Sequence, residues 1–154
     1  MKPRNQFSTT GTSGVHLWLV LWKAFHAVQA HALRNIAGLG MAYSDFGVLE
    51  ALLHKGPLTI GELGAKVLLT SGSMTAAIHR LEKRGLVTRT ENAGDRRARV
   101  IELTPKGRAL IRDAFQDHKR AMEFATAGLS SVDRQTLLNL LRQLGLSAAE
   151  RSKK

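Results

Sequence analysis

The stretch that decides the fold is residues 68–107, LLTSGSMTAAIHRLEKRGLVTRTENAGDRRARVIELTPKG. Its first half predicts an amphipathic helix, because apolar residues recur at helical spacing: Met74, Ala77, Ile78 and Leu81. Its second half contains two β-prone runs, 86–91 and 100–103, separated by the turn-forming residues NAGDRR. Thr104 and Pro105 then predict a new helix, since a proline in the first turn loses no hydrogen bond. We therefore expect a helix, a β-hairpin and a second helix.

The residues just before this stretch predict a short partner helix. In TIGELGAKV, Thr59 and Glu62 stand at the spacing of a capping box. A second short helix, capped by Ser71, follows after a tight link. Two short helices joined in this way are typical of a helix-turn-helix, and the hairpin that follows predicts a winged helix.

Longer helices are expected on both sides of this unit. The first begins at a cap on Thr12 or Ser13 and runs to about residue 37, and the next is capped by Ser44 and ends at Gly56. Two more are predicted after the hairpin, one reaching about residue 127 and one beginning at Ser130. Both have apolar stripes, and the last ends at residue 145.

The expected fold is mainly α with a small β-hairpin wing. Residues 1–11 are predicted to be a disordered tail, residues 12–146 one domain, and residues 147–154 a polar tail. Within the domain, the winged helix-turn-helix covers about 44–104, and dimerisation helices cover about 12–38 and 105–146. Amphipathic helices outside the winged helix suggest that the chain oligomerises.

Composition narrows the classes of partner and of chemistry. The chain has 23 Lys and Arg against 12 Asp and Glu, a net charge of +11, which favours nucleic acid or an anionic membrane as partner. The absence of cysteine excludes disulfides, thiolate zinc sites and cysteine nucleophiles. Since we find neither a long apolar run nor a catalytic motif, we expect a soluble cytoplasmic protein without cofactor that is not an enzyme.

Two segments carry a resemblance to a known family. LLTSGSMTAAIHRLEKRGLV resembles the recognition helix and first wing strand of MarR-family transcription regulators, and DRRARVIELTPKG resembles their wing and the helix that follows. The order of elements matches over about 13–146. The resemblance implies a homodimeric, ligand-responsive repressor that binds a double-stranded, pseudo-palindromic DNA operator. The segment LWLVLWKAFHAVQAH is most similar to members that respond to phenolic, catechol or quinone-type compounds.

The candidate DNA-reading residues lie on the outward face of the recognition helix, whose N-terminal side chains are expected to reach base edges. Arg80 can bind guanine in bidentate fashion or contact a phosphate, and His79 departs from the acidic or basic residues common there in the family. The predicted set is Ser71, Ser73, Thr75, Ala76, His79, Arg80 and Lys83.

The wing carries the second set of DNA-binding candidates. Asp95 and Arg97 are two residues apart on a strand and can pair on one face. The resemblance implies that Asp95 holds Arg97 for insertion into the minor groove, where a narrow A·T tract attracts arginine. We expect Arg96 and Arg99 to reach flanking phosphates, and Arg89 to do so from the facing strand.

Aromatic residues in the first helix have two interpretations. Trp18, Trp22, Phe25 and His26 fit a core or dimer interface, which is the commoner role of such a pattern. The family resemblance implies a ligand cleft instead, with Tyr43 and Phe46 on its far wall. In that cleft His16, His26 or Arg34 would pair with a phenolate or carboxylate. The expected effector is a small aromatic or phenolic compound.

Two rival functions stay open. A sequence-neutral architectural protein would coat nucleic acid through charge alone. A zinc-responsive regulator is the other, because the chain has six histidines and some members of the family bind zinc. No two of these histidines are three or four residues apart, so the spacing itself predicts no metal site.

Overall fold

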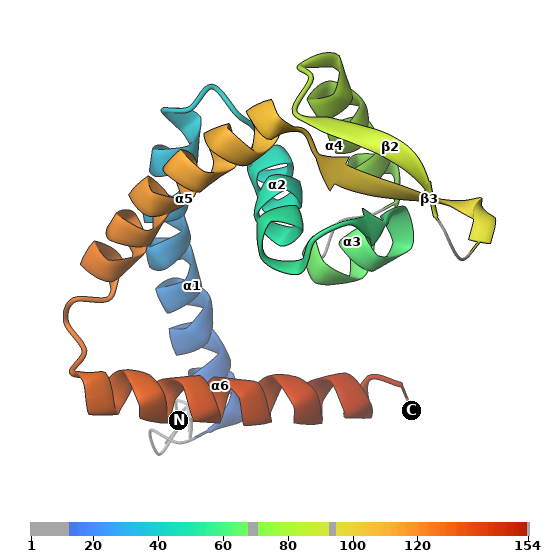
Figure 1. Ribbon diagram of the computed structural model, residues 1–154. Coiled ribbons are helices and arrows are strands. Elements are labelled where there is room, and N and C mark those ends of the chain that lie inside the picture. Colours follow the sequence, from blue (N-terminus) through green and yellow to red (C-terminus); the bar gives the residue numbers. More distant parts are fainter. Residues whose placement is uncertain (1–12, 68–70, 93–94, 154) are drawn as a thin grey trace, which may run out of the picture.

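The computed structural model describes residues 13–67, 71–92 and 95–153, so the predicted N-terminal tail lies outside the described residues. The elements in chain order are α1 (Gly14–Ala37), α2 (Tyr43–Lys55), β1 (Leu58–Thr59), α3 (Ile60–Val67), α4 (Ser71–Lys83), β2 (Val87–Asn92), β3 (Asp95–Leu103), α5 (Pro105–Ala125) and α6 (Ser131–Arg151). Figure 1 shows that the elements from α2 to β3 form a winged helix. Helices α1 and α5 pack against each other beside it.

Three of the predicted helix starts are confirmed by their caps. The hydroxyl oxygens of Ser13, Thr104 and Ser130 accept hydrogen bonds from backbone N–H groups three residues later, at 3.0–3.1 Å. These bonds satisfy donors that the first turn of a helix leaves unpaired. The predicted cap on Ser44 is wrong, because α2 already begins at Tyr43 and Ala42 precedes it without a side-chain cap.

The predicted capping box before α3 is also present. The Glu62 carboxylate accepts a hydrogen bond from the Thr59 backbone N–H at 2.7 Å, and the Glu62 N–H donates to the Thr59 hydroxyl at 3.3 Å. Hydrogen bonds from the Thr59 backbone and then from its side chain lower the pKa of the Glu62 carboxyl. This box fixes the entry to the first helix of the helix-turn-helix.

The sheet is larger than the predicted hairpin. Strand β1 pairs antiparallel with β3 and gives a three-stranded order β1-β3-β2. A strand of two residues is too short for periodicity to reveal, so the sequence analysis missed it. Strand β3 begins at Asp95, within the predicted turn, and the register shifts between Glu91 and Asn92. The wing is therefore longer than expected, and its arginines at 96 and 97 belong to a strand rather than to a turn.

One apolar core holds the winged helix together and joins it to α1 and α5. Its fully buried side chains come from α1, α2, α3, α4, α5 and the sheet: Ile36, Phe46, Leu49, Leu52, Leu63, Met74, Ile78, Leu81, Leu86, Ile101 and Ile111. Burying such side chains stabilises a fold by about 1.5–3 kcal/mol each, before the entropy cost of ordering them. The packing face predicted for α4 is confirmed.

Helix α6 differs from its prediction in length and in packing. It continues past Gly145 to Arg151, because one glycine costs a helix only about 1 kcal/mol and good helix formers follow it. No residue of α6 is buried. Its leucines are therefore exposed on a helix that leaves the body of the protomer, as Figure 1 shows. Among the helices of the described residues, none combines the length and apolar character needed to cross a membrane.

The start of α5 lies against the turn between α4 and β2. The Thr104 N–H donates to the Leu86 carbonyl at 3.1 Å, and the Thr104 hydroxyl donates to the Gly85 carbonyl at 2.7 Å. One turn later, Gly107 lies so close to the backbone of Leu86 that a Cβ at position 107 would stand 1.9 Å from the Leu86 carbonyl oxygen. Glycine is needed at position 107 because backbone, rather than a movable side chain, occupies the space.

We predict that Gly107→Ala lowers the free energy of unfolding by about 3 kcal/mol, because α5 must move away from β2. Urea unfolding followed by circular dichroism measures this. The control is Gly61→Ala in α3, where a Cβ meets nothing within 4 Å. The free energy of unfolding of that variant should be unchanged or should rise by up to about 1 kcal/mol. Equal effects of the two substitutions would contradict the packing argument.

Candidate nucleic-acid interface

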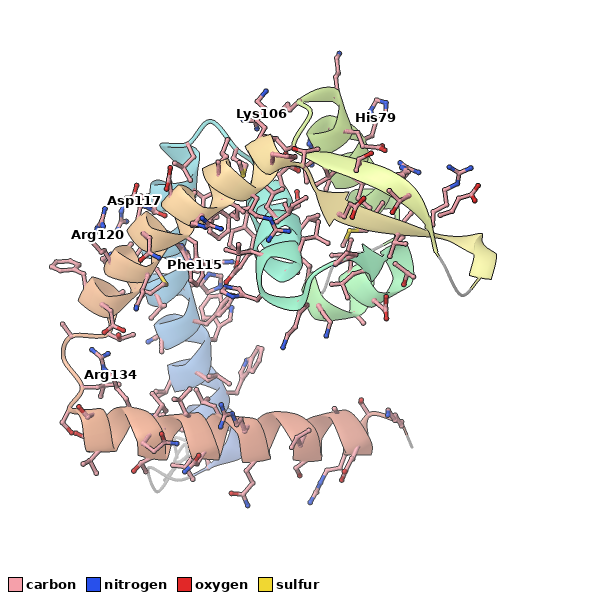
Figure 2. The ribbon with its side chains drawn as sticks, viewed as in Figure 1. His79, Lys106, Phe115, Asp117, Arg120 and Arg134 are labelled. Atoms are coloured by element: carbon pink, nitrogen blue, oxygen red, sulfur yellow. The ribbon has the colours of Figure 1, made fainter. Side chains whose placement is uncertain are left out.

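Helix α4 presents a polar face to solvent. Its apolar stripe is buried, whereas the opposite face is exposed at Gly72, Ser73, Thr75, Ala76, His79, Arg80 and Lys83. Small residues occupy the first half of this face, so a groove of DNA can come close to the backbone there. In Figure 2, His79 extends outward, away from the body of the domain.

A shallow hollow of about 610 Å³ lies between this face and the wing. It is lined by Gly72, Thr75, Ala76, His79 and Arg89. Small residues form its floor, and a histidine and an arginine stand at its edge. This arrangement brings together four of the predicted DNA-binding residues, from α4 and from β2, on one surface.

Arg80 is held by a partner that the sequence analysis did not identify. Its Nε lies 3.2 and 3.1 Å from the two carboxylate oxygens of Asp45, and its Nη2 lies 2.5 Å from Oδ1. Nη2 also donates to the Ser44 hydroxyl at 3.2 Å. A bidentate contact with guanine needs N–H groups on two neighbouring nitrogens, whereas Nε and Nη2 already donate to Asp45 and Ser44, so that Nη1 alone is left for DNA. The structure therefore favours phosphate, the other predicted partner of Arg80.

Arg89 is likewise held against the recognition helix. Its Nε donates to Glu82 Oε1 at 2.9 Å, and both side chains are about one-third exposed. This ion pair links β2 to α4, as Asp45–Arg80 links α2 to α4. The recognition helix is thus joined by charged pairs to an element on each side of it.

The wing supplies part of its predicted set. Arg99 is exposed on β3, opposite Glu91. The backbone of β3 includes Asp95, Arg96 and Arg97, whereas their side chains, and that of Ser71, lie outside the described residues. The pairing of Asp95 with Arg97 stays a prediction.

The aromatic residues proposed for a ligand do not form one site within the protomer. Tyr43 and Phe46 line a hollow of about 490 Å³ between α2, the end of α3 and α5. The α1 residues Trp18, Trp22 and Phe25 do not line it and are 49–61% exposed. His26 contacts Trp22 and Phe25 edge to face along α1 itself.

Sequence reasoning missed most of this hollow because its lining comes from three separate helices. The other lining residues are Gly47, Glu50, Ala51, His54, Lys55, Lys66, Val67 and His118. The ring of His118 is tilted against that of Phe46, with 4.9 Å between the ring centroids, and its Nδ1 is buried with no hydrogen-bond partner among the described residues. Within residues 13–67, 71–92 and 95–153, no three His, Asp or Glu residues gather closely enough to hold a metal ion.

Comparison with known proteins identifies the chain. A family model described as the MarR family matches residues 39–98. The HTH-type transcriptional regulator MhqR of Bacillus subtilis is 33% identical over 134 residues, which covers 87% of this chain and 92% of MhqR. The chain belongs to the MarR family. The uncharacterised B. subtilis regulator YkoM is 31% identical over 86% of each chain.

Solved structures of MarR-type proteins share the fold. Bordetella bronchiseptica BpsR matches with a TM-score of 0.75 and 24% identity, over 88% of this chain and 95% of BpsR. A variant of Escherichia coli MarR in complex with operator DNA matches with a TM-score of 0.74 and 22% identity, over 83% of this chain and 92% of that one. As a MarR-family protein, this chain is a DNA-binding regulator of transcription and not an enzyme.

We predict that Arg97→Ala flattens the dependence of DNA affinity on salt. Each neutralised phosphate contributes about 0.9 to the slope of log affinity against log salt, so the slope should fall by about 0.9 for each copy of the chain bound to the DNA. The loss of affinity should be largest with A·T-rich flanks, where a narrow minor groove attracts arginine. Fluorescence anisotropy with labelled DNA at several salt concentrations measures both effects.

The control is Arg120→Ala, which removes the same charge from the exposed surface of α5, far from the wing in Figure 2. It should leave the slope near that of the unmodified protein. If the Arg97→Ala and Arg120→Ala variants have the same affinity for DNA and the same salt slope, the wing does not contact DNA.

Proposed function

We propose that the protein is a cytoplasmic homodimeric repressor that binds a pseudo-palindromic operator and is released by a small aromatic or phenolic ligand. One observation carries this proposal: polar residues of α4 and Arg89 of the wing line one hollow, while exposed apolar side chains gather on α1 and α6. Helix α4 enters the major groove, and the β2–β3 hairpin reaches the adjacent minor groove. The E. coli MarR variant solved with operator DNA supports this use of the fold.

Exposed apolar side chains support the dimer. They cover the first part of α1 and most of α6, and include Val15, Leu17, Trp18, Trp22, Phe25, Val132, Leu137, Leu138, Leu140 and Leu141. An apolar patch of this kind marks an interaction surface in a protein that stays in solution. Trp18 also lines an apolar hollow of about 310 Å³ between α1 and α6, with leucines from both helices. A second copy that packs its own α1 and α6 on these faces would bury them.

The hollow lined by Tyr43 and Phe46 supports the proposal that the protein binds an aromatic ligand. Aromatic side chains form part of its wall, and Lys55 and Lys66 provide positive charge for a carboxylate or phenolate. His118 lines the hollow as well, and its ring contacts that of Phe46. The solved structure of BpsR concerns regulation of its DNA binding by 6-hydroxynicotinic acid, an aromatic acid. A ligand that fits only the form unable to bind DNA shifts the population toward that form.

The test of the function is a gel-shift with the DNA that flanks the protein's own gene, against random DNA of equal length. A repressor of the proposed kind prefers the flanking DNA by about 10³-fold or more. Similar affinity for both would instead support a sequence-neutral architectural protein.

We predict that the protein is a stable dimer by light scattering at micromolar concentration. Deletion of residues 130–154 removes α6 and its exposed leucines, and should leave monomer or aggregate with little operator binding. A well-folded truncated monomer that still binds operator tightly contradicts the proposed interface.

We also predict that small aromatic acids or phenols release the protein from DNA, measured by anisotropy, and bind with saturation by calorimetry. Tyr43→Ala should weaken this binding about tenfold or more, because Tyr43 lines the hollow. Phe124→Ala, which removes an exposed aromatic ring of α5 outside the hollow, serves as control. Release should reverse on dialysis, because the chain has no cysteine to be alkylated. If no aromatic compound up to millimolar concentration changes either signal, the proposed cleft has no support.

A further inference from the structure

Asp45 is a charged residue that is buried, with only 3% of its surface exposed. It lies in the first turn of α2, and its carboxylate faces the Arg80 guanidinium of α4. A buried carboxylate without a partner is strongly destabilising, so the pair must form whenever α2 and α4 pack together. The ion pair therefore sets where Arg80 can lie on the recognition helix.

The geometry of the pair directs the rest of the guanidinium. Asp45 holds Nε and Nη2, and a planar guanidinium bound along one edge keeps a fixed orientation. The Arg80 side chain is still 46% exposed. The hydrogen bonds that Arg80 donates to Asp45 raise the pKa of Arg80 above its usual value. A fixed, charged and half-exposed arginine is suited to an anion.

Another hollow, of about 400 Å³, is lined by both members of this pair. It is lined by Gly40, Ala42, Asp45, Arg80, Lys83 and Arg84. Three cations border it, whereas its one carboxylate is buried and paired. Nearby, Lys106 of α5 donates to the Arg84 carbonyl at 3.0 Å and adds a further charge (Figure 2). The hollow therefore has the charge of a phosphate site, on the flank of the recognition helix.

We propose that this hollow binds a phosphate of the DNA backbone through Arg80 and Arg84, and that Asp45 is a positioning residue which orients Arg80 for that contact. The proposal rests on the proposed function, because it requires α4 to lie in the groove. It assigns Arg80 to the backbone rather than to a base.

The sign of one charge change distinguishes this role from simple electrostatics. Asp45→Asn makes the protein more positive, and general attraction to DNA would then strengthen binding. Loss of the positioning contact weakens it. Asp117→Asn on α5 is the matched control, because it removes the same charge from an exposed ion pair with Arg120.

The first experiment measures operator affinity by anisotropy for both variants, with the folded fraction fixed from urea unfolding curves. We expect Asp45→Asn to bind the operator at least tenfold more weakly than Asp117→Asn, with a flatter salt slope. A merely structural pair would change the folded fraction and leave the slope of the folded protein unaltered. Asp45→Asn binding as tightly as the control, or more tightly, would overturn the proposal.

A second variant keeps the test valid if Asp45→Asn does not fold. Arg84→Gln alters an exposed side chain, and its matched control is Arg151→Gln at the end of α6. We expect Arg84→Gln to flatten the salt slope by about 2 for the dimer and to weaken operator and random DNA equally. An unchanged slope, or a loss confined to the operator, would overturn the phosphate site. If the unmodified protein shows no preference for the operator, the proposed function itself fails.

Discussion

The contact on which the arrangement of the molecule depends is the approach of α5 to the turn between α4 and β2. Gly85 makes this turn possible with a φ of +67°, and Thr104 then bonds to the carbonyls of Gly85 and Leu86. Because α5 follows β3 directly, this contact joins the wing and the recognition helix to the helix that packs on α1. The position of α5 is therefore tied to those of α4 and the wing.

The sequence predicted the features that local chemistry controls. The caps at Ser13, Thr104 and Ser130 and the box at Thr59 depend on residues three apart, and the packing stripe of α4 depends on helical period. The Asp45–Arg80 pair could not be predicted in this way, because its partners are 35 residues apart and both look like ordinary surface charges. The aromatic hollow was missed for the same reason, since α2, α3 and α5 each supply only part of it.

Helix α2 takes part both in the aromatic hollow and in the contact with α4. Phe46 lines the aromatic hollow, and its neighbour Asp45 holds the recognition helix. The helix has little freedom toward α3, because a Cβ on Gly47 would stand 2.7 Å from a Val67 methyl group. In the proposed function, a ligand in the hollow would contact the helix whose first turn is bonded to α4.

The isolation of α6 has a consequence for how the regulator is made and used. Since α6 adds no residue to the core, the packed interior of the winged helix is complete within one chain. For the dimer proposed above, folding and pairing would then be separate events, the first independent of the protein concentration and the second bimolecular. In the proposed dimer, well below its dissociation constant, the supply of operator-competent protein grows with the square of the chain concentration. A modest change in synthesis would then produce a larger change in repression.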